Sequence, residues 1–285
     1  MKVVILCGGR GSRLGDQTEL VPKPLIEVGG KPILWHIMKI YASYGYAEFV
    51  LCLGYKGHRI KEYFLNYDLH QSDITLTLGS RETAVTHRQH NEHGWRIHLV
   101  DTGAEAMTGA RIKRIEPLID TPDFLLTYGD GVADIDLDAL MAFHRSHGKI
   151  ATITGVHPLS RFGEVIVEGQ QVVEFSEKSQ VRQGCINGGF FILRREVFRY
   201  LRDDDRCAFE QEPLEQLAKD GQMMVYRHAG MWQCLDTQRD LQVLNDYWIR
   251  HPFWKVWEER RVRRKHSGLI GASSLPGAPG SSARV

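Results

Sequence analysis

The sequence contains few cysteines and no pattern that would pair them. Five cysteines are spread over 285 residues, and no two of them form a C-x-x-C motif. An odd number without such a motif excludes a small disulfide-stapled domain and a zinc site of the ribbon or finger type. We expect reduced thiols in a cytoplasmic protein, at Cys7, Cys52, Cys185, Cys207 and Cys234.

The sequence also lacks an excess of one charge and a long apolar run. It has 36 Lys and Arg residues against 35 Asp and Glu, which leaves a formal net charge of +1. Nothing in this balance attracts nucleic acid or an anionic membrane surface. No stretch approaches the roughly 18 to 20 apolar residues of a membrane-spanning helix, and the first residues lack the separate charged and apolar regions of a signal peptide. We expect neither nucleic acid nor a membrane as a partner.

What the sequence does contain is an alternation of strand and helix patterns. In the first half, apolar strand patterns at 3–7, 48–54 and 124–128 alternate with helical patterns at 33–44 and 56–65. This alternation predicts a parallel sheet with helices on both faces. Strand patterns dominate from about 151 to 193. The predicted fold class is therefore α/β, a Rossmann-like open mixed sheet with helices on both faces and a small antiparallel extension.

The C-terminal end differs in composition from the rest of the chain. We expect one domain over residues 1–258, followed by a basic run and then a stretch rich in Gly, Ser and Pro over residues 259–285. Such a stretch cannot build a core, so it predicts a disordered tail. The aromatic residues before it fit a subunit interface and a packed C-terminal helix equally well: Tyr247, Trp248, Phe253, Trp254 and Trp257.

A glycine-rich turn follows the first strand pattern, in the sequence MKVVILC-GGRGSRLG. Backbone N–H groups at Gly8, Gly9 and Gly11 can converge on an anion, and Arg13 adds a planar cationic group suited to phosphate oxygens. Lys23 lies between two prolines, which restrict its backbone. Together these residues predict a site for nucleotide phosphates.

The spacing of this turn excludes two common alternatives. A dinucleotide fingerprint requires Gly or Ala where Leu14 stands, and the Gly-Lys-Ser/Thr of a P-loop is absent. A nicotinamide-dependent dehydrogenase is disfavoured further because no acidic residue ends the second strand pattern.

A second informative segment, FLLTYGDGVADID, places Asp130 at the end of an apolar strand. A carboxylate there faces the crevice where open α/β sheets bind ligands, and Mg²⁺ prefers such oxygen donors. A turn with a capping aspartate is the alternative. Asp236 is the best candidate for a second metal ligand. The alternatives Asp134, Asp136 and Asp138 have a spacing that suits an exposed strand or turn, and spacing alone does not choose among these four.

Two further segments carry candidate ligand-binding residues. Thr108 introduces a predicted helix in which Arg111 is the basic residue favoured to contact a nucleotide. In FSEKS and NGGFF, Glu177 and Asn187 are typical readers of sugar hydroxyls, and Lys178 can neutralise a phosphate monoester. A hairpin with a charged tip explains the FSEKS and NGGFF segments equally well.

Taken together, the motifs resemble those of the sugar-1-phosphate nucleotidyltransferases. The shared signature is GGRGSRL followed by PKP, and the resemblance extends from residue 1 to about 258. Within that family, GGKPILWHIMK, GYKGHRIKEYF, TYGDGVADID, NGGFF and WQCLDT are similar to the branch that uses CTP and glucose 1-phosphate. Three positions depart from the family pattern: Ser12 replaces a usual threonine, Ala110 a glycine and Ser179 a proline.

The resemblance implies a set of site residues. Asp130 and Asp236 would hold Mg²⁺, and the catalytic residues would be Arg13, Lys23 and Lys178. The sugar phosphate would bind in the portion of about 151–240, at Glu177, Lys178, Asn187 and Gly188. The nucleotide would contact Leu6, Cys7, Gly8, Gly9, Arg10, Gly11, Ser12, Arg13, Lys23, Thr108, Arg111 and Gly129.

The implied reaction is in-line attack of glucose 1-phosphate on the α-phosphorus of CTP, giving CDP-glucose and pyrophosphate. The resemblance also implies a homo-oligomer that supplies CDP-sugars for surface polysaccharide. Two alternatives stay open: a uridylyl- or thymidylyltransferase acting on a hexose 1-phosphate, and a non-catalytic sugar-nucleotide sensor. The sensor would be expected to have lost Lys23 or a metal carboxylate, and the sequence retains them.

Overall fold

A computed structural model of the chain describes most of its residues. The structure does not describe residues 16–17, 19, 76, 80–84, 89, 158–163, 169, 177–184, 259 and 261–285. It describes the backbone but not the side chains of residues 12, 85–88, 164–168 and 173–176. No helix in the described part of the chain combines the length and apolar character needed to cross a bilayer.

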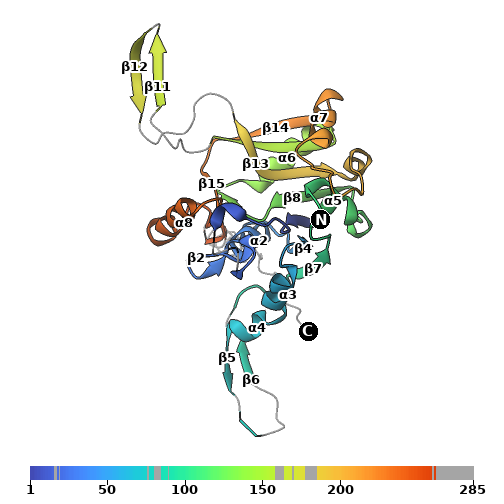
Figure 1. Cartoon of the computed structure of the whole chain (residues 1–285), viewed down its shortest axis with the longest axis vertical. Helices are drawn as coiled ribbons and strands as arrows, with labels where there is room; N and C mark the ends of the chain where they lie inside the picture. Colours follow the sequence, from blue (N-terminus) through green and yellow to red (C-terminus); the bar gives the residue numbers. More distant parts are fainter. Residues whose placement is uncertain are drawn as a thin grey trace, which may run out of the picture.

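A seven-stranded mixed sheet forms the centre of the molecule (Figure 1). Its order is β14-β10-β13-β8-β1-β4-β7, where β8, β1, β4 and β7 run parallel and β13 is antiparallel to both of its neighbours. This confirms the predicted open mixed sheet. The strands are β1 (Val3–Leu6), β4 (Glu48–Leu53), β7 (Arg96–Asp101), β8 (Asp123–Tyr128), β10 (Ala151–Val156), β13 (Ile186–Arg194) and β14 (Met223–His228).

Helices cover both faces of the sheet, as predicted. Side chains alternate along a strand, so Val3 and Ile5 enter one apolar core while Val4 and Leu6 enter the other. The first core includes residues of α2 (Ile33–Ser43), α3 (Gly57–Leu65), α6 (Leu137–His147) and α8 (Gln238–Arg250). The second includes residues of α5 (Thr108–Arg114), η4 (Arg195–Tyr200) and α7 (Glu212–Lys219).

Short elements join these layers and frame the site. They are η1 (Ser12–Leu14), η2 (Lys23–Leu25), β2 (Glu27–Val28), β3 (Lys31–Pro32), α4 (Tyr67–His70), η3 (Glu116–Leu118), β9 (Gly131–Ala133) and β15 (Trp232–Cys234). The pairing of β9 with β15 matters most for function, because it joins segments that lie about a hundred residues apart in sequence.

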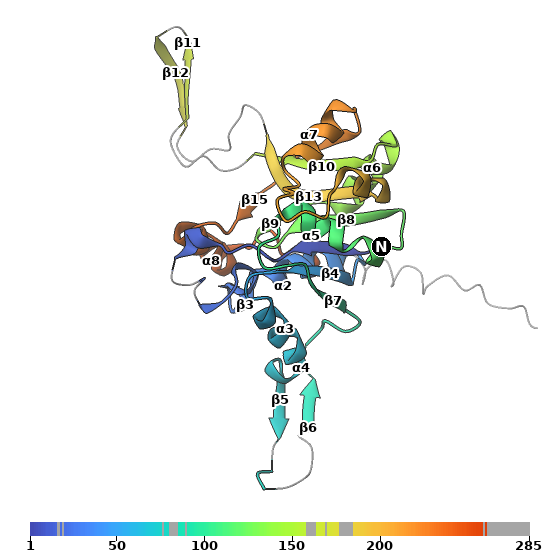
Figure 2. The same ribbon diagram turned by 45° about the vertical axis from the view of Figure 1, so that its right-hand side comes forward.

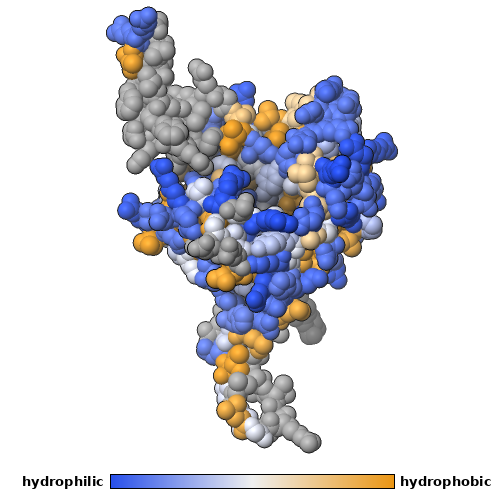
Figure 3. All heavy atoms as spheres, in the orientation of Figure 1, coloured by the Kyte–Doolittle hydropathy of each residue, from blue (hydrophilic) through white to orange (hydrophobic). Residues whose placement is uncertain are grey.

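Two antiparallel hairpins extend from this body at opposite ends (Figures 1 and 2). One is β5 (Ser72–Thr75) with β6 (Val85–Arg88), and the other is β11 (Glu164–Glu168) with β12 (Gln171–Ser176). The second confirms the predicted antiparallel extension. On the face that Figure 3 shows, the body is mainly hydrophilic, whereas hydrophobic residues gather on the projection around α4 and β5. Leu65, Leu69, Ile74 and Leu78 are exposed there.

The acidic stretch after the TYGDG motif does not form the exposed strand or turn that its spacing suggested. Asp136 is the N-cap of α6, and its carboxylate accepts hydrogen bonds from the backbone N–H groups of Asp138 and Ala139 at 3.0 and 3.1 Å. A capping carboxylate satisfies N–H groups that the first helical turn leaves unpaired. The alternate spacing of the aspartates therefore reflects a helix start.

The aromatic segment near the C-terminus packs within the chain. Trp254 is fully buried in the first core, and its indole Nε1–H donates to His36 Nδ1 at 3.3 Å. Arg260 lies over the ring of Tyr44 and donates to the carbonyl of Ser43. Two of the five aromatic residues lie in α8 and three follow it, and all five pack against the first core: Tyr247, Trp248, Phe253, Trp254 and Trp257. The subunit interface stays a prediction. Residues 261–285 of the predicted tail lie outside the described part of the chain.

Candidate active site

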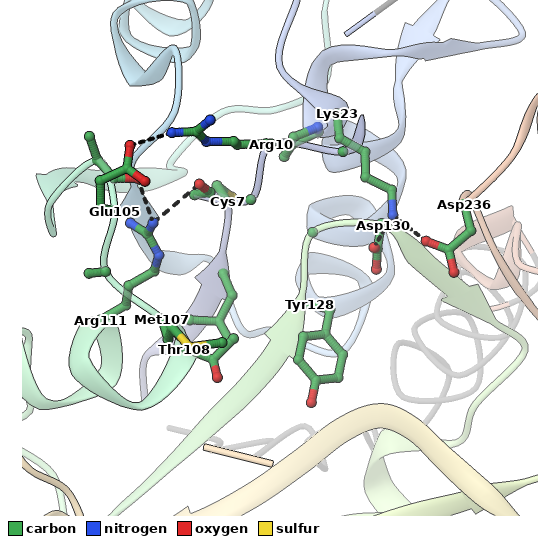
Figure 4. A pocket seen from close by; sticks show the side chains of 18 of the residues that line it. Cys7, Arg10, Lys23, Glu105, Met107, Thr108, Arg111, Tyr128, Asp130 and Asp236 are labelled. Carbon is green, nitrogen blue, oxygen red and sulfur yellow. Dashed lines mark hydrogen bonds and ion pairs between the residues drawn. The ribbon is translucent and has the colours of Figure 1, made fainter. Parts of the chain in front are cut away.

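A cavity of about 420 Å³ opens beyond the carboxyl ends of β1 and β8 (Figure 4). Open α/β sheets bind ligands at this edge. Thirteen of the residues predicted from sequence line it: Leu6, Cys7, Gly8, Gly9, Arg10, Gly11, Arg13, Lys23, Thr108, Arg111, Gly129, Asp130 and Asp236. Six further lining residues were not predicted: Pro24, Ala104, Glu105, Ala106, Met107 and Tyr128.

The glycines of the loop and of the TYGDG motif allow close approach of neighbouring groups. A Cβ atom on Gly8 would lie 2.1 Å from the guanidinium carbon of Arg111, and one on Gly129 would lie 2.8 Å from the carbonyl oxygen of Leu6. Gly11 has a φ of +64°, which L side chains rarely adopt. Glycine at these positions therefore lets the backbone pack closely against Arg111 and against the end of β1.

Lys23 occupies the space between the two predicted metal ligands. Its Nζ lies 2.6 Å from Oδ2 of Asp130 and 2.6 Å from Oδ1 of Asp236 (Figure 4). Arg13 adds a second cation, at 3.2 Å from Oδ2 of Asp236. The flanking prolines place Lys23 at the start of η2, where Pro22 has an extended conformation. The structure therefore joins residues from three distant segments in one cluster of opposite charges.

Burial and pairing act in opposite directions on these groups. Burial lowers the pKa of Lys23, but the charge of Asp130 and the hydrogen bonds to both carboxylates outweigh it and raise that pKa. For Asp236, burial raises the pKa, while the hydrogen bond and charge of Lys23, together with Arg13, give a net lowering. Each group is thus stabilised in its charged form by its partners.

The β9–β15 pair brings Asp236 to this position. Cys234 lies opposite Gly131 in the ladder, and the Leu235 N–H donates to the Asp130 carbonyl at 2.8 Å. After β15 the chain enters α8 through a capping box, in which Asp240 accepts hydrogen bonds from the N–H groups of Asp236 and Thr237 at 3.1 and 2.8 Å. Asp236 is therefore fixed from both sides.

The donor set at this position fits Mg²⁺. Among the described residues, no group of three or more His, Cys, Asp and Glu side chains is arranged to hold a metal ion. Mg²⁺ does not need such a cage, because it is usually bound by one or two carboxylates together with water and substrate phosphates. Asp130 and Asp236 are the two carboxylates that line the cavity beside Lys23.

The other candidate aspartates lie elsewhere. Asp134 Oδ1 accepts hydrogen bonds from the backbone N–H of Met231 at 2.8 Å and from the ring of His228 at 2.9 Å. Asp138 pairs with Arg260 at 2.9 Å. Of the four residues that sequence spacing left open, Asp236 is the one that lies beside Lys23 and lines the cavity with Asp130.

Arg111 reaches the cavity wall from α5 but is held by the protein itself. Its guanidinium is buried and donates to the carbonyl oxygens of Leu53 at 2.9 Å, Gly103 at 2.8 Å and Gly8 at 3.2 Å. It also donates to Thr102 Oγ1 at 3.0 Å. Burial lowers its pKa. Arg111 thus ties the glycine loop to the loop before α5.

An exposed ion pair also joins the glycine-rich loop to the loop before α5. Arg10 Nη2 lies 2.6 Å from Oε1 of Glu105, and both side chains are mostly exposed (Figure 4). Sequence reasoning missed Glu105, although it stands three residues before the predicted Thr108. It also missed Tyr128, whose signal was its place directly before Gly129 and Asp130.

The predicted sugar-phosphate residues are described only in part. Asn187 and Gly188 lie in β13 beside the cavity: Asn187 Nδ2 donates to Tyr128 Oη at 3.1 Å, and the Gly188 carbonyl accepts from the Trp232 indole at 2.8 Å. Glu177 and Lys178 lie outside the described residues, as does the side chain of Ser12.

Comparison with known proteins shows the family of this chain. Residues 2–249 match the family model described as nucleotidyl transferase. The chain belongs to the nucleotidyl transferase family. It is 47% identical over 260 residues to the glucose-1-phosphate cytidylyltransferase of Salmonella typhi, an alignment that covers 90% of this chain and 100% of that protein. A probable glucose-1-phosphate cytidylyltransferase of Bacillus subtilis is also 47% identical, over 258 residues, with the same coverage of both chains.

Solved structures support the nucleotidyl transferase fold. HddC from Yersinia pseudotuberculosis, complexed with GMP-PN, superposes with a TM-score of 0.63 at 21% sequence identity, over 87% of this chain and 99% of that one. At this identity the likeness concerns the fold alone.

Proposed function

We propose that this nucleotidyl transferase moves a cytidylyl group from CTP to α-D-glucose 1-phosphate, giving CDP-glucose and pyrophosphate. The observation that carries the proposal is the cluster of Lys23 with Asp130 and Asp236 beside a glycine-rich anion loop. The choice of CTP and glucose 1-phosphate is supported by the 47% identity to two proteins named for that activity.

The reaction requires alignment of two anions that repel each other. A phosphate oxygen of glucose 1-phosphate attacks the α-phosphorus of CTP; a new P–O bond forms, and the bond from the α-phosphorus to the bridging oxygen breaks. The electron pair leaves with pyrophosphate. The nucleophile is already an anion, so no general base is required. The protein must supply orientation and positive charge at the reacting phosphates.

The residues around the cavity supply these two requirements. In this proposal the N–H groups of the glycine loop bind phosphate oxygens, while Arg13 and Lys23 offset the charge that builds on pyrophosphate. Lys178 and Asn187 would position the sugar phosphate. When bound, Mg²⁺ would be held by Asp130 and Asp236 and would neutralise and orient phosphate oxygens.

The proposal is tested by measuring pyrophosphate release with Mg²⁺, glucose 1-phosphate and each nucleoside triphosphate in separate reactions. We expect release with CTP and a product with the mass of CDP-glucose. Preference for UTP or dTTP would overturn the choice of nucleotide. Absence of pyrophosphate release with every nucleotide would favour the sugar-nucleotide sensor instead. Replacing glucose 1-phosphate by mannose 1-phosphate or galactose 1-phosphate tests the sugar.

The metal is tested by removal and replacement. Chelation with EDTA should abolish pyrophosphate release, and excess Mg²⁺ should restore it. Asp236→Asn should raise the Mg²⁺ concentration needed for half-maximal rate, whereas the matched change Asp138→Asn, outside the cavity, should not. Equal Mg²⁺ requirements in the two variants would argue against Asp236 as a ligand.

A further inference from the structure

A carboxylate that does not line the cavity joins two hydroxyl groups that do. Glu210 lies between η4 and α7, and its Oε1 accepts a hydrogen bond from Tyr128 Oη at 2.7 Å. Its Oε2 accepts a hydrogen bond from Thr108 Oγ1. Tyr128 ends β8, two residues before Asp130, and Thr108 begins α5 on the neighbouring wall (Figure 4).

These contacts fix the direction in which the Tyr128 hydroxyl can hydrogen-bond. A carboxylate only accepts, so the single hydroxyl proton of Tyr128 is directed to Glu210. Asn187 Nδ2 then donates to the same oxygen at 3.1 Å. The orientation of the Asn187 amide is set by the Gly189 N–H, which donates to its Oδ1 at 2.9 Å. Any further partner of the Tyr128 oxygen must therefore donate to it.

The same reasoning applies to Thr108. Its proton is directed to Glu210, and its oxygen accepts from the backbone N–H of Phe209 at 2.8 Å. A hydroxyl oxygen has two acceptor positions, so one stays available on Thr108. It too can accept but cannot donate to a ligand.

The segment that carries Glu210 is well anchored. Met107 N–H donates to the Asp205 carbonyl at 2.8 Å, and Ala110 N–H donates to the Cys207 carbonyl at 3.1 Å. Phe209 is fully buried in the second core. Glu210 is thus presented from a packed segment, and its carboxylate position follows the backbone.

We propose that Glu210 is a positioning residue for both substrates. It holds the hydroxyls of Tyr128 and Thr108 as acceptors, so that a sugar hydroxyl donates to Tyr128 and a hydroxyl or amino group of the nucleotide donates to Thr108. Donor-rich ligands such as a hexose and cytidine match this polarity. The inference rests on the proposed function for the identity of the two ligands.

The test compares Glu210→Ala and Glu210→Gln with Glu212→Gln. Glu212 lies two residues away and pairs with Arg202 at 2.6 Å outside the cavity. We expect Glu210→Ala to raise the KM values for CTP and glucose 1-phosphate about tenfold each, with kcat changed less than about threefold. Glu210→Gln keeps one side-chain oxygen as a hydrogen-bond acceptor and should raise the two KM values less. Glu212→Gln should change neither.

A double-mutant comparison separates positioning from simple support of the fold. Tyr128→Phe should raise the KM for glucose 1-phosphate in the wild-type background but have little added effect in Glu210→Ala. Equal effects in both backgrounds would overturn the proposal, as would a Glu210→Ala variant with a lowered melting temperature and unchanged KM values.

Calorimetric titration with CTP alone tests the positioning role of Glu210 separately from the proposed transferase activity, because it measures binding without turnover. If the wild-type protein releases no pyrophosphate with any nucleotide, the proposed transferase activity fails. Weaker CTP binding by Glu210→Ala than by Glu212→Gln would then still support the positioning role. Equal binding by the two variants would overturn it.

Discussion

The Nζ atom of Lys23 lies 2.6 Å from Oδ2 of Asp130, a residue 107 positions further along the chain. The same Nζ lies 2.6 Å from Oδ1 of Asp236, 213 positions away. One ammonium group therefore bridges two carboxylates and reduces the repulsion between them. A lysine so placed can serve both the phosphates and the carboxylates that would hold the metal.

Replacing Lys23 by alanine should remove most turnover while leaving the fold intact. The loss of one charge-stabilising contact at the reacting phosphates corresponds to about 10²–10³ in kcat. Asp130→Ala should have a comparable effect because the metal would lose a ligand. Lys219→Ala, on the exposed surface of α7, is the matched control for charge. Pyrophosphate release checks the rates, and retention of more than about a tenth of the wild-type kcat would count against either role.

His36 should make the protein less stable in mild acid. It is fully buried, with Nε2 at 2.8 Å from the Val28 carbonyl and Nδ1 accepting from Trp254. Burial lowers the pKa of His36 to about 4. The unfolded chain, with the ordinary pKa of about 6.5, therefore binds the proton first as pH falls. Stability is complete above about pH 6.5 and falls toward pH 4, by about 3 kcal/mol for this group.

Urea unfolding between pH 7 and pH 4 measures this dependence. His36→Gln should flatten the curve but not abolish it, because burial also lowers the pKa of His144 to about 4. If the unfolding free energy of His36→Gln depended on pH as strongly as that of the wild type, His36 would titrate alike in the folded and unfolded states.

Arg111 should matter for the stability of the site as well as for binding. Its buried guanidinium donates to the carbonyls of Leu53, Gly103 and Gly8. In Arg111→Met these three hydrogen bonds would be lost, although Thr102 still donates to the Leu53 carbonyl and the Tyr55 N–H to the Gly8 carbonyl. The loss of these buried hydrogen bonds makes us expect a decrease of about 1–3 kcal/mol in unfolding free energy. Denaturant unfolding is the measurement, with the exposed Arg202→Met as control. If both variants unfold alike, the contacts of Arg111 contribute little.

Two glycines of the site should respond differently to an added methyl group. Gly129→Ala would place a Cβ 2.8 Å from the Leu6 carbonyl oxygen, which also accepts the Gly129 N–H at 3.1 Å. This overpacking should cost about 1–3 kcal/mol. Gly9→Ala meets nothing within 4 Å and should change stability by less than about 0.5 kcal/mol. Melting temperatures of the pair test the difference, and similar values would contradict it.

The sequence by itself determined the features that depend on local chemistry. Alternating strand and helix patterns gave the mixed sheet with helices on both faces. The glycines after β1, the prolines beside Lys23 and the position of Asp130 at a strand end indicated a phosphate and metal site. These inferences need only backbone freedom, charge and residue spacing, which are properties of short segments.

Tertiary structure decided which distant groups meet. Asp236 joins Lys23 because β15 pairs with β9, whereas Asp136 caps a helix and Asp134 pairs with His228. Glu210 reaches Tyr128 only through the packing of its segment against α5. The physical reason is that an isolated carboxylate has the same chemistry at each of these positions. Its partners and burial are set by chain segments that lie far away in the sequence.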